Sequence, residues 1–239
     1  MIRFEGLEKK YGDFAAVHPL LFEVKQGEIF GFLGPNGAGK TTTIRMMMGI
    51  LVPSGGRVLL NSFDSATQST EAKKSVGYLP DEPIFYDYLR GREILGFVAE
   101  IHGYLRADAN ARAIELLAEY GLADASEEFA VNYSMGMKKR LGLAMAMIHR
   151  PKILILDEPI NGLDPRGAHE IQSKLKAFAE NGGTVFLSTH LLDLAEKVCN
   201  RVAIIDRGNI CAVDTVSNLR DRFLPGGTLE EIFLKVIEP

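Results

Sequence analysis

Eight consecutive residues carry the clearest chemistry in this sequence: Gly34-Pro35-Asn36-Gly37-Ala38-Gly39-Lys40-Thr41. They match the phosphate-loop pattern G-x-x-x-x-G-K-[ST], in which backbone N–H groups surround a polyphosphate. Glycine permits the positive φ angles and the close approach to a ligand that such a loop requires. We expect Lys40 to reach the β- and γ-phosphates, the Thr41 hydroxyl to bind Mg²⁺, and Thr42 to contact another phosphate oxygen.

The residues on either side fit this interpretation. Glu28–Leu33 is short and mostly apolar, which predicts a buried strand, and Thr41–Met48 is predicted to be helical. A strand–loop–helix joint directs backbone N–H groups and the positive end of the helix at one point. The alternative is a Gly-rich turn without a ligand, and the flanking strand and helix weigh against it.

Two acidic residues, Asp157 and Glu158, end an apolar run that begins at Lys152. The run is typical of a strand buried on both faces of a parallel sheet. Ligands bind at the carboxyl ends of such strands, so Asp157 is expected near the phosphate loop, holding Mg²⁺ through water. Glu158 is then free to orient a nucleophilic water. His190 also follows a predicted strand, 184–189, which favours a γ-phosphate role over that of an ordinary surface or core histidine.

The sequence contains a second helix start that can bind an anion. Ser134 is a suitable N-cap for a predicted helix that runs to Ile148. The first N–H groups of that helix, in the segment that includes Gly136, are free to bind a phosphate. Asp164 is predicted to cap another helix, with Pro165 at its first position. One chain therefore offers two phosphate-binding helix ends that are far apart in sequence.

The remaining elements frame these motifs. Residues 2–11 and 15–24 alternate apolar and polar side chains, which predicts antiparallel strands ahead of the phosphate loop. Tyr11 lies in the turn between them, where it can stack on an adenine ring or simply be a partly buried turn residue. Residues 92–148 are predicted to be helical, as an insertion between core strands. A capping box from Thr228 to Glu231 begins a short amphipathic C-terminal helix.

The loop Ile84-Phe85-Tyr86-Asp87-Tyr88-Leu89 contains five large apolar or aromatic residues. Such a loop either folds back on its own core or forms a docking groove for a partner. Both alternatives remain open at this point.

Composition limits the class of protein. The chain has 239 residues and a net charge of −4, without a run of basic residues, so no nucleic-acid partner is expected. Cys199 and Cys211 form no C-x-x-C pair and are expected to be small core residues in a reducing compartment. The N-terminus lacks the apolar core of a signal peptide, and no apolar stretch reaches about 18 residues. Any membrane span must therefore belong to another chain.

Taken together, these motifs resemble the nucleotide-binding subunit of an ABC transporter over essentially the full length of the chain. The phosphate loop, Ser134-x-Gly136, Ile153–Glu158, Asn161–Asp164 and His190 occur in the order and spacing of that family. The chain looks most similar to bacterial ATP-binding subunits that energise exporters with a separate membrane subunit. The end of the chain, 229–234, also resembles the end of that group.

The resemblance implies a role for each motif. It makes ATP the nucleotide, Tyr11 the adenine-stacking residue, Gly34–Thr42 the Walker A loop, and Asp81 the Q-loop residue that contributes to the Mg²⁺ site. Tyr133–Met137 becomes the signature motif, Asp157 and Glu158 the Walker B aspartate and catalytic base, Asn161–Asp164 the D-loop, and His190 the switch histidine.

Three positions depart from the family pattern. Asp81 stands where a glutamine is usual. An aspartate cannot donate an amide hydrogen bond, and its shorter side chain needs a bridging water to reach Mg²⁺. Glu82 could take the place of Asp81 if the loop shifts. Met135 replaces a glycine in the signature, so the backbone there must tolerate a side chain. Ile160 stands where a threonine is common, which affects packing more than chemistry.

We therefore expect an α/β fold with a phosphate-loop NTPase parallel-sheet core, an N-terminal antiparallel β region and an α-helical subdomain. The whole chain, 1–239, forms one ATPase domain: 1–84 and 151–239 make the core with the β region, and 85–150 make the helical signature subdomain. Each MgATP would lie between the phosphate loop of one chain and Ser134–Gly136 of a second, identical or paralogous chain. The assembly would be cytoplasmic and peripheral on the inner face of the cell membrane, beside a multi-span permease subunit.

Two rival functions use the same nucleotide chemistry. A soluble ABC ATPase that acts in translation or DNA maintenance usually carries two cassettes or long heptad arms, and this sequence has neither. An ordinary phosphate-loop kinase or GTPase would leave Ser134-x-Gly136 and His190 without a role, and the guanine-reading Asn-Lys-x-Asp motif is absent.

Overall fold

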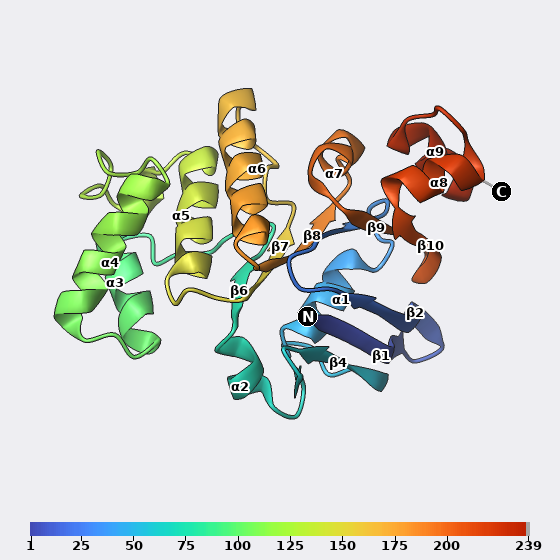
Figure 1. Cartoon of the computed structure of the whole chain (residues 1–239). Helices are drawn as coiled ribbons and strands as arrows, with labels where there is room; N and C mark the ends of the chain where they lie inside the picture. The colour runs from blue at the N-terminus through green and yellow to red at the C-terminus, as the bar shows by residue number, and fades with distance from the viewer. Residues whose placement is uncertain (238–239) are drawn as a thin grey trace.

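The computed structural model describes residues 1–237 and contains two sheets flanked by helices. In Figure 1, the helices α3 (Gly91–Ile101) and α4 (Arg106–Glu119) form one end of the molecule, and α8 (Val216–Phe223) and α9 (Leu229–Ile237) form the other. Within residues 1–237, no helix combines the length and the apolar character that crossing a bilayer requires.

The smaller sheet has four antiparallel strands in the order β2-β1-β4-β5. Its strands are β1 (Ile2–Tyr11), β2 (Phe14–Val24), β4 (Gly55–Leu60) and β5 (Phe63–Asp64). The antiparallel pair predicted ahead of the phosphate loop is confirmed. Most of its apolar side chains face the core, where the rings of Phe4 and Phe22 stack at a centroid distance of 4.3 Å, whereas Phe14 and Leu21 are exposed.

The larger sheet has six strands in the order β10-β9-β3-β8-β7-β6, and all neighbours except the β10–β9 pair are parallel. Its strands are β3 (Ile29–Leu33), β6 (Val76–Leu79), β7 (Ile153–Asp157), β8 (Thr184–Thr189), β9 (Arg201–Asp206) and β10 (Asn209–Thr215). Every residue of β3, β7 and β8 is buried, as expected for strands covered on both faces. The predicted parallel core is confirmed.

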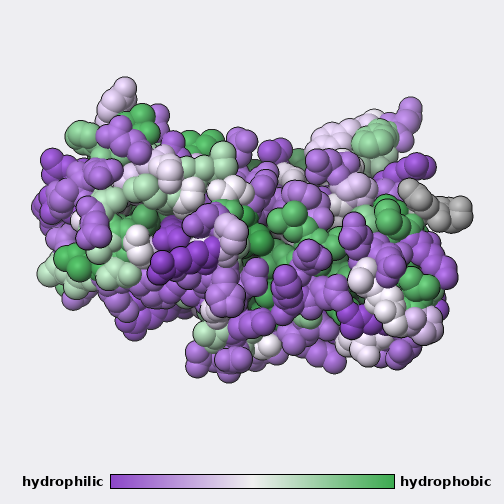
Figure 2. Space-filling model, turned by 90° about the horizontal axis from the view of Figure 1, so that it is seen from above, coloured by the Kyte–Doolittle hydropathy of each residue, from purple (hydrophilic) through white to green (hydrophobic). Residues whose placement is uncertain are grey.

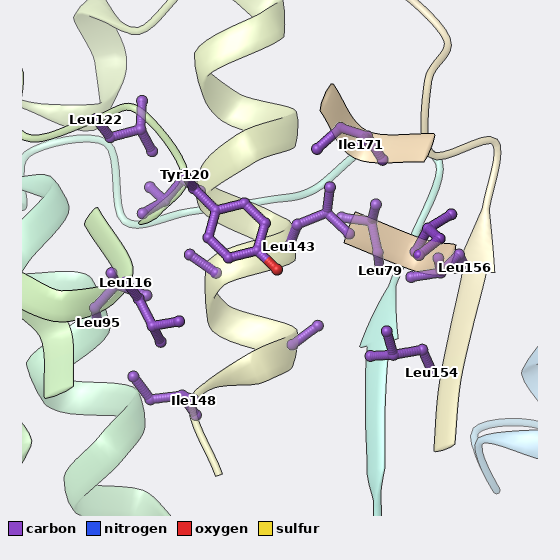
Figure 3. Packing of buried hydrophobic residues seen from close by; sticks show 14 of the residues in the cluster. Leu79, Leu95, Leu116, Tyr120, Leu122, Leu143, Ile148, Leu154, Leu156 and Ile171 are labelled. Carbon is purple, nitrogen blue, oxygen red and sulfur yellow. The ribbon is translucent and has the colours of Figure 1, made fainter. Parts of the chain in front are cut away.

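The helices cover the larger sheet and connect its strands. The remaining ones are α1 (Lys40–Met47), α2 (Ser69–Lys73), α5 (Met135–Met147), α6 (Pro165–Glu180) and α7 (Leu192–Val198), with a short 3₁₀ turn at Ala130–Asn132. Figure 3 shows α5 between the helical end of the molecule and the strands of the sheet, with Leu143 and Tyr120 among the buried residues that join them. Helix α5 thus links the helical segment to the sheet that carries the site.

The helical prediction for 92–148 is confirmed in kind, but its apolar face is only partly buried. Ile94 is buried, whereas Phe97 and Ile101, which share its helical spacing, are exposed. The buried face of α3 is instead completed by Leu95 and Ala99. Figure 2 shows hydrophobic residues at the surface of this end of the molecule.

One further expectation needs correction, and one helix was not predicted. Cys199 is largely buried, but Cys211 is exposed on β10, so the prediction that both are core residues is wrong for Cys211. Helix α8 has no counterpart in the sequence analysis, although Thr215 caps it by accepting a hydrogen bond from the Asn218 N–H. The capping box at Thr228 and Glu231 is confirmed by reciprocal hydrogen bonds.

Candidate nucleotide site

The phosphate loop joins the end of β3 to the start of α1 through glycines that no other residue could replace without movement. Gly37 and Gly39 have φ angles of 81° and 107°. A Cβ atom on Gly34 would lie 2.4 Å from the Ile205 carbonyl oxygen, and one on Gly39 would lie 2.8 Å from the Ala16 carbonyl oxygen. The loop therefore needs glycine both for its turns and for its tight packing on neighbouring strands.

Lys40 is buried and folds back over the loop. Its Nζ donates hydrogen bonds to the carbonyl oxygens of Gly34, at 2.6 Å, and Pro35, at 3.0 Å. Burial lowers the pKa of Lys40, and the carboxylates of Glu158 and Asp157 act in the opposite direction. A polyphosphate bound beside this ammonium would neutralise its positive charge, which burial has removed from water.

A cavity of about 370 Å³ opens over the loop, within the size range of small-molecule sites. Its lining brings together most of the residues that the sequence analysis singled out: Tyr11, Asn36, Gly37, Gly39, Lys40, Thr41, Thr42, Asp81, Asp157 and Glu158, with Phe14 and Ala16 in addition. A larger groove of about 910 Å³ lies between α3 and α4, and its lining shares no residue with this set.

Thr41 and Asp157 form the oxygen pair expected of a magnesium site. The Thr41 hydroxyl donates to Asp157 Oδ2 at 3.2 Å. Asp157 is buried, and burial raises the pKa of its carboxyl group. In the described part of the chain, no three His, Cys, Asp or Glu side chains gather into a metal cage. Mg²⁺ usually takes one or two carboxylates together with substrate phosphates, so this donor set fits it.

Glu158 is the most constrained side chain of the site. Its Oε2 accepts a hydrogen bond from the Thr189 hydroxyl at 2.9 Å, and its Oε1 accepts from the His190 N–H at 3.0 Å and lies 2.7 Å from His190 Nδ1. Because a carboxylate accepts, we assign the imidazole proton to Nδ1. The backbone of Glu158 has φ = 47°, a conformation that costs a non-glycine residue about 1–2 kcal/mol. The surrounding contacts therefore hold a strained residue in place.

Asp81 lies at the rim of the cavity, with half of its side chain exposed. Its Oδ1 is 3.4 Å from the Nζ atom of Lys139, and its backbone carbonyl also accepts a hydrogen bond from that ammonium. The sequence analysis missed Lys139, because a lysine between Lys138 and Arg140 is typical of a solvated helix face. No spacing rule identifies its partners.

The second helix end forms as predicted but does not line this cavity. The Ser134 hydroxyl oxygen accepts a hydrogen bond from the Met137 N–H at 3.2 Å and caps α5. Asp164 caps α6 by accepting from the Gly167 N–H at 2.9 Å. The described residues that line the cavity include neither Ser134, Gly136 nor Asp164. The Met135 side chain reaches across to Gly162, where a Cβ atom would lie 2.3 Å from its sulfur.

A glycine-rich loop at the end of a parallel strand, with carboxylates at the ends of neighbouring strands, defines a phosphate-loop nucleoside triphosphatase. Residues 17–161 match the family model described as ABC transporter. The chain belongs to this family, and it is an ATP-binding, ATP-hydrolysing subunit of the ABC transporter type.

Relatives and solved structures agree with this assignment. The chain is 43% identical to the ABC transporter ATP-binding protein YdbJ of Bacillus subtilis (strain 168), over 89% of this chain and 68% of that protein. It is 37% identical to the bacitracin transport ATP-binding protein BcrA of Enterococcus faecalis, over 93% of this chain and 71% of that protein. A solved ATP-binding subunit of an ABC transporter superposes with a TM-score of 0.92 at 30% identity, covering 99% of each chain. A dimeric ATP-binding cassette bound to ADP and Pi shares the fold, with a TM-score of 0.83 at 22% identity and coverage of 90% of this chain and 99% of that one.

Tyr11 provides the first testable prediction. Its ring is 52% exposed at the cavity, and Lys9 Nζ lies 5.1 Å from the ring centroid. If an adenine stacks on this ring, Tyr11→Ala should weaken ATP binding by about 1–3 kcal/mol, whereas Tyr11→Phe should retain it. Calorimetric titration with a non-hydrolysable ATP analogue measures this effect. Unchanged ATP affinity in Tyr11→Ala would show that Tyr11 does not stack on the adenine.

Proposed function

We propose that this subunit binds MgATP in the cavity over the phosphate loop and hydrolyses it in a dimer, to energise transport through a separate membrane subunit. The observation that carries the proposal is the convergence on one cavity of Lys40, Thr41, Asp157 and Glu158 from two segments of the chain that are more than a hundred residues apart. The proposed division of the chain remains a core of 1–84 and 151–239 with a helical subdomain of 85–150.

Each side chain has a distinct task in this proposal. Lys40 and the N–H groups at the start of α1 bind the phosphates, while Thr41 and Asp157 hold the metal. When bound, Mg²⁺ would supply positive charge that neutralises the negative charge developing on the phosphate oxygens. Glu158 orients the attacking water and accepts its proton. His190, hydrogen-bonded to Glu158, keeps that carboxylate aimed at the cavity and presents its other ring nitrogen to the γ-phosphate.

A second copy of the chain would complete the site. Ser134 is exposed at the start of α5, and its helix end is not part of the cavity in its own chain. In a two-fold dimer, Ser134 and Gly136 of each chain can cover the nucleotide held by the other. Asp164, which ends the D-loop segment, would lie near the same interface. ATP would then bridge two surfaces, and its hydrolysis would weaken the bridge.

Glu158→Gln tests the dimer and the catalytic base together. Glutamine keeps the size of the side chain but cannot take a proton, so hydrolysis should fall by roughly 10²–10⁴-fold while ATP binding survives. With hydrolysis blocked, the protein should elute as a dimer with MgATP and as a monomer with MgADP in gel filtration. Adding Ser134→Arg should abolish the dimer, because the larger side chain clashes with the γ-phosphate. Normal turnover, or a monomer at saturating MgATP, would contradict the mechanism.

The loop 84–89 is the proposed contact with the membrane subunit. Three of its side chains are exposed, by 90% for Ile84, 67% for Tyr86 and 81% for Tyr88, whereas Phe85 and Leu89 pack against the core. The alternative that the loop folds back on its own core therefore holds for Phe85 and Leu89, and the docking alternative stays a proposal for the three exposed residues. We propose that a helix of a multi-span permease binds the exposed residues, which places the subunit at the cytoplasmic face of the cell membrane. Asp81 lines the nucleotide cavity and precedes Ile84 by three residues, so it connects this proposed contact to the nucleotide site.

Tyr88→Asp is the better test of this contact, since Phe85→Asp would also disturb the core. The variant should lose co-purification with the permease but keep its affinity for ATP. Leu21→Asp is a matched control, because Leu21 is an equally exposed apolar residue on β2, far from the loop in sequence. If Tyr88→Asp assembles as well as Leu21→Asp, the loop is not the docking site.

A further inference from the structure

The Lys139 side chain joins its own helix to two other segments of the site, and neither the motifs nor the proposed catalytic roles use it. It lies on α5, and only 3% of the residue is exposed. Its ammonium donates hydrogen bonds to the backbone carbonyl of Asp81, to the Asp81 carboxylate and to the backbone carbonyl of Glu158, the last at 2.8 Å. A lysine has three donors, and three oxygens from two other segments take them. The hydrogen-bonding capacity of this buried cation is therefore fully used.

The contact with Glu158 falls on the strained peptide of the site. The N–H of Glu158 donates to the Ser188 carbonyl at 2.9 Å, and its carboxylate is held by Thr189 and His190. Its carbonyl oxygen accepts a hydrogen bond from Lys139 Nζ at 2.8 Å and a longer one from the Asn161 N–H at 3.3 Å. A non-glycine residue at φ = 47° keeps that conformation only where its surroundings impose it. Lys139 supplies the shorter of the two contacts to this carbonyl, and the one that comes from another element, helix α5.

The contact between Lys139 and Asp81 bears on whether the Asp81 carboxylate is available to bind Mg²⁺. Among the described residues, Lys139 is the cation that Asp81 pairs with, at 3.4 Å. A buried ammonium is stable only with acceptors and opposite charge beside it. Asp81 supplies both, through its carbonyl and its carboxylate. The aspartate that departs from the usual family residue at this position thus has a partner within the chain, on the helix that begins at Ser134.

We propose that Lys139 is a positioning residue for ATP hydrolysis, which holds the Glu158 peptide and the Asp81 loop against α5, and that Asp81 is its counter-ion rather than a magnesium ligand. This inference rests on the proposed catalytic role of Glu158. It means that helix α5 and the catalytic carboxylate cannot shift independently. A displacement of the docking loop beside Asp81 therefore reaches Glu158 through one ammonium group.

The first experiment removes the ammonium group with the substitution Lys139→Met, which keeps an unbranched side chain. Lys139 does not line the cavity, so Lys139→Met should leave the KM for MgATP within about twofold. Its kcat should fall at least about tenfold, since misplacing a catalytic group by about 1 Å costs up to 10²-fold in rate. In the nucleotide-free protein, backbone amides of residues 80–83 and 158–161 should exchange hydrogen faster than in the wild type. Lys138→Met is the control for the exchange measurement, because the described residues offer the Lys138 ammonium no hydrogen-bond partner.

The second experiment is a double-mutant cycle between Lys139 and Asp81. Asp81→Asn should lower kcat severalfold in the wild-type background and have no further effect in Lys139→Met, because the counter-ion has nothing left to neutralise. The Mg²⁺ concentration for half-maximal activity should stay within about twofold in Asp81→Asn. The Mg²⁺ requirement is measured in the single variant Asp81→Asn, so this test does not depend on any folding defect of Lys139→Met.

Three results would overturn the inference: an unchanged kcat in Lys139→Met, fully multiplicative effects of the two substitutions, or a tenfold higher Mg²⁺ requirement in Asp81→Asn. Glu158→Gln separates this failure from a failure of the proposed function. If Glu158→Gln is inactive while Lys139→Met turns over normally, the catalytic base stands and only the role of Lys139 is wrong. Normal turnover of Glu158→Gln would refute both the catalytic role of Glu158 and the positioning role of Lys139.

Discussion

The site depends on the parallel pairing of β7 with β8, which aligns the ends of two strands that are about thirty residues apart in sequence. Asp157 pairs with Ser188 in the register of the two strands. Glu158 therefore emerges beside Thr189 and His190, and its carboxylate meets their donors at 2.7–3.0 Å. A shift of one residue would turn every side chain of β7 to the opposite face and separate these groups. Since β3 pairs with β8 on its other side, the phosphate loop begins at the same edge.

Burial of the central strands makes this register secure. Every residue of β7 is buried, and each of its isoleucine and leucine side chains contributes about 1.5–3 kcal/mol on leaving water. That contribution exceeds the roughly 1–2 kcal/mol that the left-handed backbone of Glu158 costs. The strand can therefore end in a strained residue without losing its place in the sheet. The strain turns the chain sharply and leaves the Glu158 carbonyl free to meet Lys139.

The sequence is informative where one local pattern has one structural solution. The glycines of residues 34–39 and the apolar run into Asp157 each predict a local geometry that tertiary packing then confirms. Sequence patterns do not predict burial where it depends on the element that packs opposite. Phe97 shares the helical spacing of Ile94 yet is exposed, because α3 is covered on a different face. The same reason accounts for Cys211, which belongs to the edge strand β10.

Long-range polar contacts are the part of the site that sequence reasoning could not reach. Lys139 and Asp81 are separated by 58 residues, and the spacing of charges along a helix carries no information about such a partner. The positive φ of Glu158 is equally hidden, since a glutamate has no local preference for it. The cap at Ser134, by contrast, follows from local sequence, and its absence from the cavity lining of its own chain agrees with the expectation that it serves a second chain.

The account therefore rests on a nucleotide site built from two chains, and a cross-link measures this directly. One chain carries Asn36→Cys and a second carries Met135→Cys, both positions being exposed, with Glu158→Gln and Cys211→Ser in each background. The account predicts that a short bifunctional thiol reagent joins position 36 of one chain to position 135 of the other with MgATP and not with MgADP. Absence of this link at saturating MgATP, or a link of equal yield within a single chain that carries both cysteines, would contradict it.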